Sequence, residues 1–119
     1  MKISPEEGLN RLSAERKLFT ELYSHGSLSV EIYKPLKEDL QTPHDRDEVY
    51  VIIAGHGDFI SDGKKHTFKQ GDFFFVPAHI EHRFENFSDD FSTWIIFFGP
   101  IGGEANTIGS QQSAISNWQ

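Results

Sequence analysis

Short stretches in which hydrophobic and polar residues alternate recur along most of this chain. Successive residues of a strand face opposite sides of a sheet, so this alternation is typical of half-buried strands. It predicts strands at Leu18–Tyr23 and Leu28–Tyr33, joined into a hairpin by the polar turn sequence at 24–27. The segment from Lys34 to Pro43 lacks the alternation and is predicted to be a loop.

The strand pattern continues through the middle of the chain. Further strands are predicted at 49–53, 58–60, 66–68, 73–76, 82–87 and 93–98. Between the second and third of these, Asp62-Gly63 suits a type I′ turn and predicts a hairpin. Gly55-His56-Gly57 is predicted to be another turn. Eight or more short strands separated by turn signals predict an all-β sandwich or barrel.

The two ends of the chain depart from this pattern. Ser4-Pro5-Glu6-Glu7 predicts a helix start, with serine as N-cap, proline at the first helical position and acids in the first turn. We expect this short helix to pack outside the barrel or against a partner subunit. Residues 101–119 are rich in Gly, Ser, Gln and Asn, and are predicted to be disordered or an arm on another surface. The chain is thus expected to form one domain over 1–119, with a core at about 16–100.

Composition excludes several classes of protein. The 119 residues suffice for one core, and the 11 phenylalanines are large enough to fill the interior of a small barrel. There is no cysteine, which excludes a disulfide framework and a thiolate site. The net charge of −7 has no basic stripe, so no nucleic-acid partner is expected. No apolar run reaches the roughly 18 residues of a membrane span and no segment resembles a signal peptide, so we expect a cytoplasmic protein without a membrane partner.

Three residues are candidate metal ligands. His44 and Glu48 are four residues apart, so they can share one face of a strand and meet His82 inside a barrel. Two imidazoles and a carboxylate leave open positions on iron, and the same set also suits zinc, manganese or nickel. The alternative is that the two histidines are only hydrogen-bonded inside the barrel and hold no metal.

The stretches TPHDRDEVYVIIAG (42–55) and GDFFFVPAHIEHRFEN (71–86) resemble the paired motifs of the cupin superfamily. In the first motif, His44 takes the second histidine position, Glu48 the glutamate and Gly55 the closing glycine. The second motif is matched in register by Gly71, Pro77, His82 and Asn86. The resemblance, and the 15 residues between the motifs, are those of a small single-domain bacterial cupin. It implies a double-stranded β-helix, the jelly-roll cupin barrel, and a divalent metal ion such as Fe, Mn, Ni or Zn.

The chain departs from the family pattern at three positions. Thr42 stands where the first histidine belongs, His79 where a second glycine is usual, and Leu36 where the first motif opens with glycine. The loss of one nitrogen donor lowers metal affinity but leaves a further place for water or substrate. His79 is either a substitute fourth ligand, three residues before His82, or a solvated turn residue. His25, His56 and His66 are expected at the surface.

A substrate pocket is predicted beside the metal. Arg46 shares the parity of the candidate ligands and could hold a substrate carboxylate, although a pair with Asp45 or Asp47 is the slightly favoured alternative. Asp47 itself is expected to be a solvated loop acid. Tyr50 and Phe84 have inward parity, so they either line the pocket or are plain core residues. The predicted pocket residues are Thr42, Arg46, Tyr50, His79 and Phe84.

Three functions are compatible with these residues. The resemblance implies a metal-dependent enzyme that oxygenates or isomerises a small polar molecule inside the barrel. The alternative is a non-catalytic module that binds a small ligand, with the metal as an anchor. An interaction module is the third possibility and rests only on the helix and the tail. A homodimer is expected because small cupins commonly pair by strand exchange or sheet packing.

Overall fold

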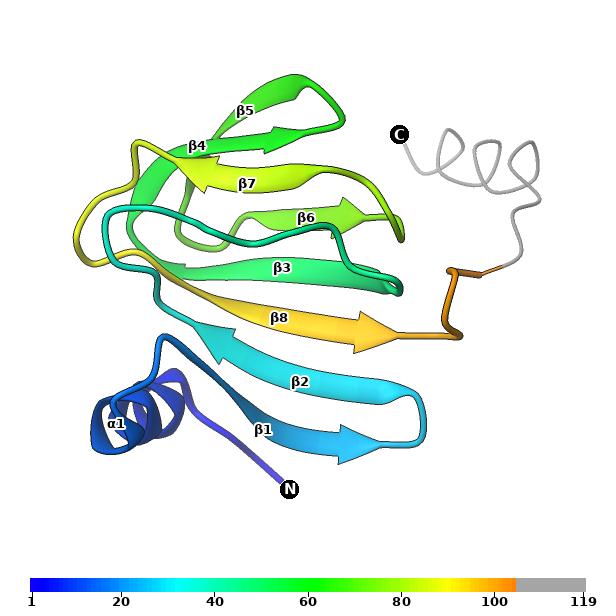
Figure 1. The fold of residues 1–119 in the computed structure, drawn as a ribbon. Helices are drawn as coiled ribbons and strands as arrows, with labels where there is room; N and C mark the ends of the chain where they lie inside the picture. The colour runs from blue at the N-terminus through cyan, green and yellow to red at the C-terminus, as the bar shows by residue number, and fades with distance from the viewer. Residues whose placement is uncertain (105–119) are drawn as a thin grey trace.

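The computed structural model describes residues 1–104 and shows one helix and eight strands in two antiparallel sheets (Figure 1). The helix α1 spans Pro5–Glu15. The strands are β1 (Phe19–His25), β2 (Leu28–Tyr33), β3 (Asp47–Ala54), β4 (His56–Ser61), β5 (Lys64–Lys69), β6 (Phe73–Val76), β7 (His82–Glu85) and β8 (Ser92–Phe98). From residue 105 onward, the predicted tail (101–119) lies outside the described residues.

The two sheets form a jelly roll. Five strands make one sheet in the order β1-β2-β8-β3-β6, and three make the other in the order β5-β4-β7. Strands that are distant in the sequence lie side by side, as β2 and β8 do (Figure 1). This arrangement confirms the predicted all-β jelly-roll fold with a short N-terminal helix. No helix within residues 1–104 is both long and apolar enough to cross a membrane.

Local signals set several boundaries as predicted. The Ser4 hydroxyl accepts a hydrogen bond from the backbone N–H of Glu7 at 3.1 Å and so caps α1. The helix packs on the outer side of β2, where Gly8 lies against Ile32. Asp62 and Gly63 have φ angles of 51° and 75°, as a type I′ turn requires. The helix start, its place outside the barrel and the second hairpin are therefore confirmed.

The predicted turn at Gly55-His56-Gly57 is wrong. His56 and Gly57 belong to β4, and only Gly55 interrupts the chain between β3 and β4. Gly55 has a φ of 90°, and a Cβ at this position would lie 2.6 Å from the Cα of Phe91. One glycine in a left-handed conformation is thus enough to redirect the chain, and the second glycine is not needed for the turn.

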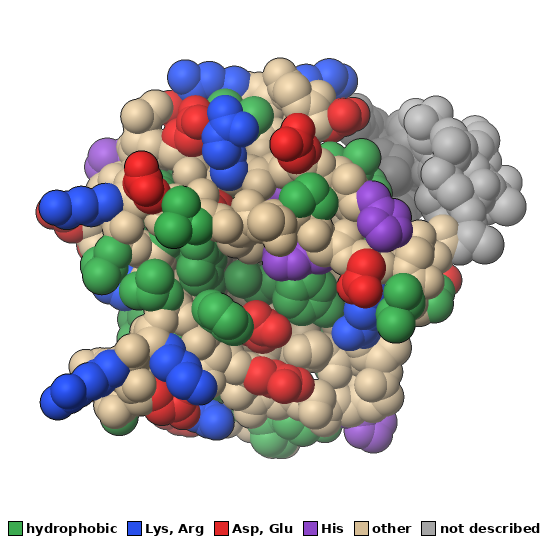
Figure 2. Space-filling view, in the orientation of Figure 1, with side chains coloured by type: hydrophobic (Ala, Val, Ile, Leu, Met, Phe, Trp, Pro, Cys, Tyr) green, Lys and Arg blue, Asp and Glu red, His purple; other side chains and the backbone are tan. Residues whose placement is uncertain are grey.

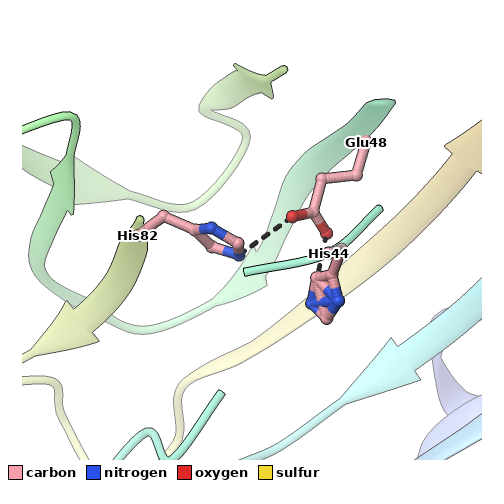
Figure 3. Close-up of side chains that lie close together, drawn as sticks. All are labelled: His44, Glu48 and His82. Atoms are coloured by element: carbon pink, nitrogen blue, oxygen red, sulfur yellow. Dashed lines mark ion pairs between the residues drawn. The ribbon is translucent and has the colours of Figure 1, made fainter. Parts of the chain in front are cut away.

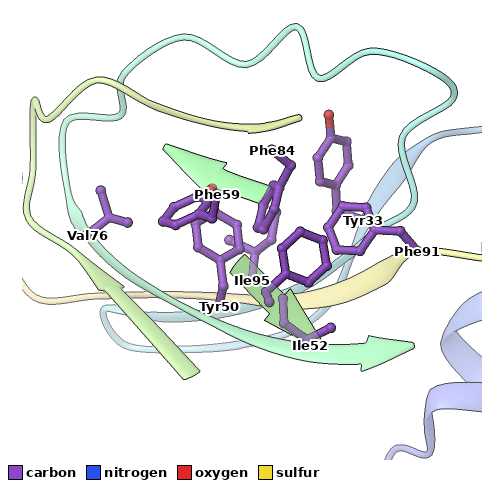
Figure 4. Packing of buried hydrophobic residues seen from close by; sticks show 9 residues of the cluster. Tyr33, Tyr50, Ile52, Phe59, Val76, Phe84, Phe91 and Ile95 are labelled. Atoms are coloured by element: carbon purple, nitrogen blue, oxygen red, sulfur yellow. The ribbon is translucent and has the colours of Figure 1, made fainter. Parts of the chain in front are cut away.

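The inner faces of the two sheets enclose an aromatic core (Figure 4). The register of β3 places Glu48, Tyr50 and Ile52 on the inner face, opposite Phe97, Ile95 and Thr93 of β8. The core residues are Tyr33, Tyr50, Ile52, Phe59, Phe68, Val76, Phe84, Phe91 and Ile95. Several of the phenylalanines therefore fill the interior as predicted, whereas Phe73 and Phe75 are 63% and 50% exposed on the outer face.

Residues 101–104 are held against the segment that leads into β3. The N–H of Gly102 donates to the carbonyl of Asp45 at 2.6 Å, and the N–H of Glu104 donates to Oδ2 of Asp47 at 3.0 Å. The other carboxylate oxygen of Asp47 accepts from the N–H of Ala78 at 2.9 Å. Asp47 is buried, so the expectation of a solvated loop acid is wrong. Its carboxylate joins three segments of the chain instead.

Candidate metal centre

His44, Glu48 and His82 converge at one end of the barrel (Figure 3). Glu48 is the second residue of β3 and faces inward, while His82 opens β7 in the other sheet. His44 lies in the loop before β3. One ligand atom from each residue lies within 4.8 Å of the others. The three side chains predicted to share a site are thus brought together from both sheets and a loop.

The Glu48 carboxylate is buried between the imidazoles of His44 and His82. The side chain is 1% exposed, with Oε1 at 2.9 Å from Nε2 of His82 and Oε2 at 3.9 Å from Nε2 of His44. Despite these short distances, neither oxygen accepts a well-aligned hydrogen bond from residues 1–104. An unsatisfied buried carboxylate is costly, and a cation held between it and the imidazoles would offset that cost.

The hydrogen bond of His82 fixes which of its nitrogens faces the site. Nδ1 lies 2.8 Å from the carbonyl oxygen of Ile80. That oxygen can only accept, so Nδ1 carries a proton and Nε2 is the nitrogen that faces Glu48. Metal-ligating histidines are commonly oriented in this way. The position between Nε2 and the carboxylate therefore suits a proton or a metal ion.

The electrostatics of His82 support a cation at this position. Burial by itself would lower the pKa of the His82 imidazole. The Glu48 carboxylate and the Ile80 carbonyl act in the opposite direction and raise the pKa above its ordinary value. The same negative environment that favours a proton on Nε2 would also favour a divalent cation there.

Gln41 is a polar residue of the centre that the sequence did not indicate. Its Oε1 lies 3.2 Å from Nε2 of His44 and accepts a hydrogen bond from the Tyr50 hydroxyl at 3.0 Å. Its Nε2 donates to Oδ2 of Asp39 at 2.9 Å, which turns the amide oxygen toward the site. Because a side-chain amide oxygen can ligate hard cations, Gln41 offers a fourth donor atom beside the cluster. No motif includes it, and the loop around it has no strand periodicity.

Tyr50 connects the centre to the core. Its hydroxyl lies 3.0 Å from Nε2 of His82, while its ring packs edge-on against Phe59 and Phe84. Burial, together with the nearby Glu48 carboxylate, raises the pKa of the Tyr50 phenol well above its ordinary value. The hydroxyl thus stays protonated and donates to Gln41. Tyr50 is both a core residue and a wall of the site.

The other predicted pocket residues are spread around the centre. Thr42 is exposed and lines a cavity together with His44, whereas Phe84 is buried in the core. The side chain of His79 is exposed, and its backbone N–H donates to the carbonyl of His44 at 2.7 Å. Within residues 1–104, His79 therefore steadies the loop that carries a candidate ligand and is not part of the three-residue cluster.

Arg46 makes a contact that neither sequence interpretation predicted. Its Nε donates to the carbonyl of Gly99 at 3.2 Å, so it fastens the segment after β8 to the segment before β3. Among the described residues it forms no ion pair with Asp45 or Asp47, and that favoured alternative is wrong. The remaining histidines, at positions 25, 56 and 66, are exposed as expected.

Comparison with known proteins places the chain in a family. A family model described as the cupin domain matches residues 29–98. An uncharacterised protein of Streptomyces coelicolor is 28% identical over 98 residues, which cover 77% of this chain and 93% of that protein. A cupin protein from Bacteroides fragilis is similar in fold, with a TM-score of 0.58, 18% identity and coverage of 91% of this chain and 89% of its own. A crystal structure of DMSP lyases has a TM-score of 0.59 and 21% identity, over 68% of this chain and 46% of that one. Since the family match extends over more than half of its length, the chain belongs to the cupin family.

Proposed function

We propose that this cupin binds a divalent metal ion through His44, Glu48 and His82 and acts as a metal-dependent enzyme on a small polar molecule. The observation that carries the proposal is the Glu48 carboxylate, which is buried, faces two imidazoles and accepts no well-aligned hydrogen bond within residues 1–104. Iron, manganese, nickel and zinc all suit two imidazoles and a carboxylate. When bound, such a metal supplies Lewis-acid or redox chemistry for an isomerisation or an oxygenation.

Two further observations support an enzyme. Three protein ligands leave positions open for substrate, as in catalytic sites, and a cavity lined by Thr42 and His44 gives access to them. Structural relatives include DMSP lyases, so catalysis does occur on this fold. A shared fold does not transfer a reaction, so the residues of the site carry the proposal.

A non-catalytic ligand-binding module is the second candidate. It is favoured by the two polar neighbours of the proposed ligands, Gln41 and Tyr50, which are hydrogen-bonded to each other. The raised pKa of the Tyr50 phenol keeps this group protonated, so it is not a proton acceptor at neutral pH. Metal-dependent turnover of any small polar molecule would exclude this second candidate.

Elemental analysis of tag-free protein tests metal binding. We expect a near-stoichiometric divalent metal in the wild type and its loss in the variant His82→Ala. His25→Ala is the matched control, because His25 is exposed at the end of β1 and is not one of the three clustered residues. A wild type that stays empty when iron, manganese, nickel and zinc are offered would overturn the proposal.

The place of Gln41 beside His44 and Tyr50 gives a separate prediction. Replacing Gln41 by alanine should lower metal affinity by about 10- to 100-fold, the range found when a residue that supports the ligands is lost. Thr42→Ala is the control, since Thr42 is an exposed residue of the same loop and is not one of the three clustered residues. Competition with a chromophoric chelator measures both affinities. Equal affinities in the two variants would exclude Gln41 from the centre.

We also propose that the chain forms a homodimer through the outer face of the five-stranded sheet. The strands β3, β6 and β8 place a group of apolar side chains on this outer face. These are Val49, Val51, Phe73, Phe75, Trp94 and Ile96. The side chain of Phe73 is 63% exposed, and that of Phe75 is 50% exposed. Exposed apolar patches of this kind are typical of protein interfaces, and a second copy offers a face of matching character.

Placing a charged residue on this outer face tests whether the chain forms the proposed dimer. Phe75→Lys should convert the dimer to a monomer, because each copy would place a buried ammonium in the apolar contact. Size-exclusion chromatography with light scattering gives the mass. Leu36→Lys is the control, since Leu36 is an exposed hydrophobic residue in the loop after β2. A wild-type monomer at micromolar concentration would contradict the proposal.

A further inference from the structure

A cavity of about 240 Å³ lies on the inner side of the five-stranded sheet, next to the candidate metal centre. Its walls include His44 and Gln41 of the centre, together with Phe19, Glu31, Tyr33, Leu40, Thr42, Ile95 and Phe97. Four of these residues also line a neighbouring cleft of about 730 Å³ between β1 and the loop after β2. One face of the molecule is hollowed near its middle, where hydrophobic and acidic side chains gather beside a histidine (Figure 2).

Glu31 is the one acidic residue on the wall of this cavity within the described part of the chain. In the sheet it lies opposite Ile95 of β8, which in turn lies opposite Tyr50 of β3. The Glu31 side chain thus faces the interior on the same side as Tyr50. Its other neighbour across the sheet is Glu21 of β1, a second acid.

The Glu31 carboxylate has no cationic partner within the described residues. Over residues 1–104, no lysine, arginine or histidine forms an ion pair with it. Burial raises the pKa of the Glu31 carboxyl, and the carboxylates of Glu21 and Glu48 raise it further. An inward-facing acid that is surrounded by other acids is stabilised by a positive charge, and the cavity has room for one to enter.

The remaining walls suit an organic cation. The rings of Phe19, Tyr33 and Phe97 line the cavity, and Phe19 is 58% exposed. Aromatic faces attract ammonium groups through their quadrupole, and apolar rings also bury the carbon skeleton of a ligand. A carboxylate among aromatic rings is therefore a recognition site for an ammonium group attached to an apolar body.

We infer that this cavity binds a small organic amine, with its ammonium group paired to Glu31 and its apolar part packed between Phe19 and Phe97. The inference deepens the proposed function, on which it rests, because it names the substrate class of the proposed enzyme. The opposite end of such a ligand lies toward His44 and the open positions of the metal. Glu31 thus selects the charge of the ligand, while the aromatic walls select its shape.

Three probes of similar size but different charge test the inference. Isothermal titration calorimetry of the full-length, metal-loaded protein would compare 2-phenylethylamine, 2-phenylethanol and phenylacetate. We expect the amine to bind at least about tenfold more tightly than the other two, as a charge-assisted contact implies. Glu31→Gln should remove this preference, and Glu31→Asp should restore most of it. Glu6→Gln, on the exposed side of α1, is the charge-matched control and should keep the wild-type preference.

The outcomes separate this inference from the proposed function. If the wild type binds metal but shows no preference for the amine, the inference is overturned and the metal centre stands. A preference that survives in folded Glu31→Gln, checked by circular dichroism, also overturns it. The titration is repeated on chelator-treated protein, since Glu31 and the aromatic walls do not require the metal. Amine preference in a protein that never takes up metal would support this site and refute the proposed metal function.

Discussion

Replacing Glu48 by glutamine should abolish tight binding of divalent metal. The substitution keeps the shape of the side chain but removes the only negative charge among the three candidate ligands. Since loss of a supporting residue already costs 10- to 100-fold in affinity, loss of a ligand should cost more than about 100-fold. Competition with a chromophoric chelator would measure the change for zinc and manganese.

Thermal unfolding gives an independent readout of the same substitution. A metal at about 100 times its dissociation constant stabilises a protein by about 2.7 kcal/mol, so wild type should melt at a higher temperature when metal is added. The Glu48→Gln variant should show no such increase at the same metal concentration. Asp89→Asn is the control, because it removes one charge from an exposed turn and should respond as wild type does. Wild-type metal affinity in Glu48→Gln would show that Glu48 is not a ligand.

The strands and the meeting of the three candidate ligands were predictable because local signals determine them. β2 begins and ends where its alternating pattern indicates, and β6 where a short apolar run is bounded by turn residues. Strand parity places Glu48 on the inner face of β3, and the motif spacing brings His44, which lies in the loop before that strand, and His82 to the same site. Such features depend on residues that are close in sequence, or on a spacing that the fold always brings together.

The residues that complete the centre were not predictable, because long-range contacts orient them. Asp39 and Gln41 lie in a loop without periodicity. Oδ2 of Asp39 accepts from the N–H of Phe84, 45 residues away, as well as from the amide of Gln41. Asp47 is likewise buried, and its carboxylate accepts hydrogen bonds from the backbone N–H groups of Ala78 and Glu104. A loop acid looks the same in the sequence whether water or distant N–H groups solvate it.

Replacing Phe84 by alanine should destabilise the protein by about 3–5 kcal/mol, the usual cost of deleting a buried aromatic ring. Phe84 is 1% exposed, and its ring centroid lies 4.6 Å from those of Phe59 and Phe91 and 5.0 Å from that of Tyr50. These neighbours belong to both sheets and the segment before β8, so no single side chain can move to fill the cavity. Since a domain is typically stable by only about 5–15 kcal/mol, the variant should be close to unfolding.

Urea denaturation would measure this loss against Phe19→Ala, which removes the same group from a ring that is 58% exposed. The control should lose much less, because most of that ring already contacts water in the folded state. The effect of Phe84→Ala should also reach the metal centre, since the Phe84 ring supports the ring of Tyr50, whose hydroxyl lies 3.0 Å from Nε2 of His82. Metal affinity should therefore fall in whatever fraction of the variant remains folded. A loss below about 1 kcal/mol would mean that the two sheets repack around the missing ring, and that the core tolerates change beside the site.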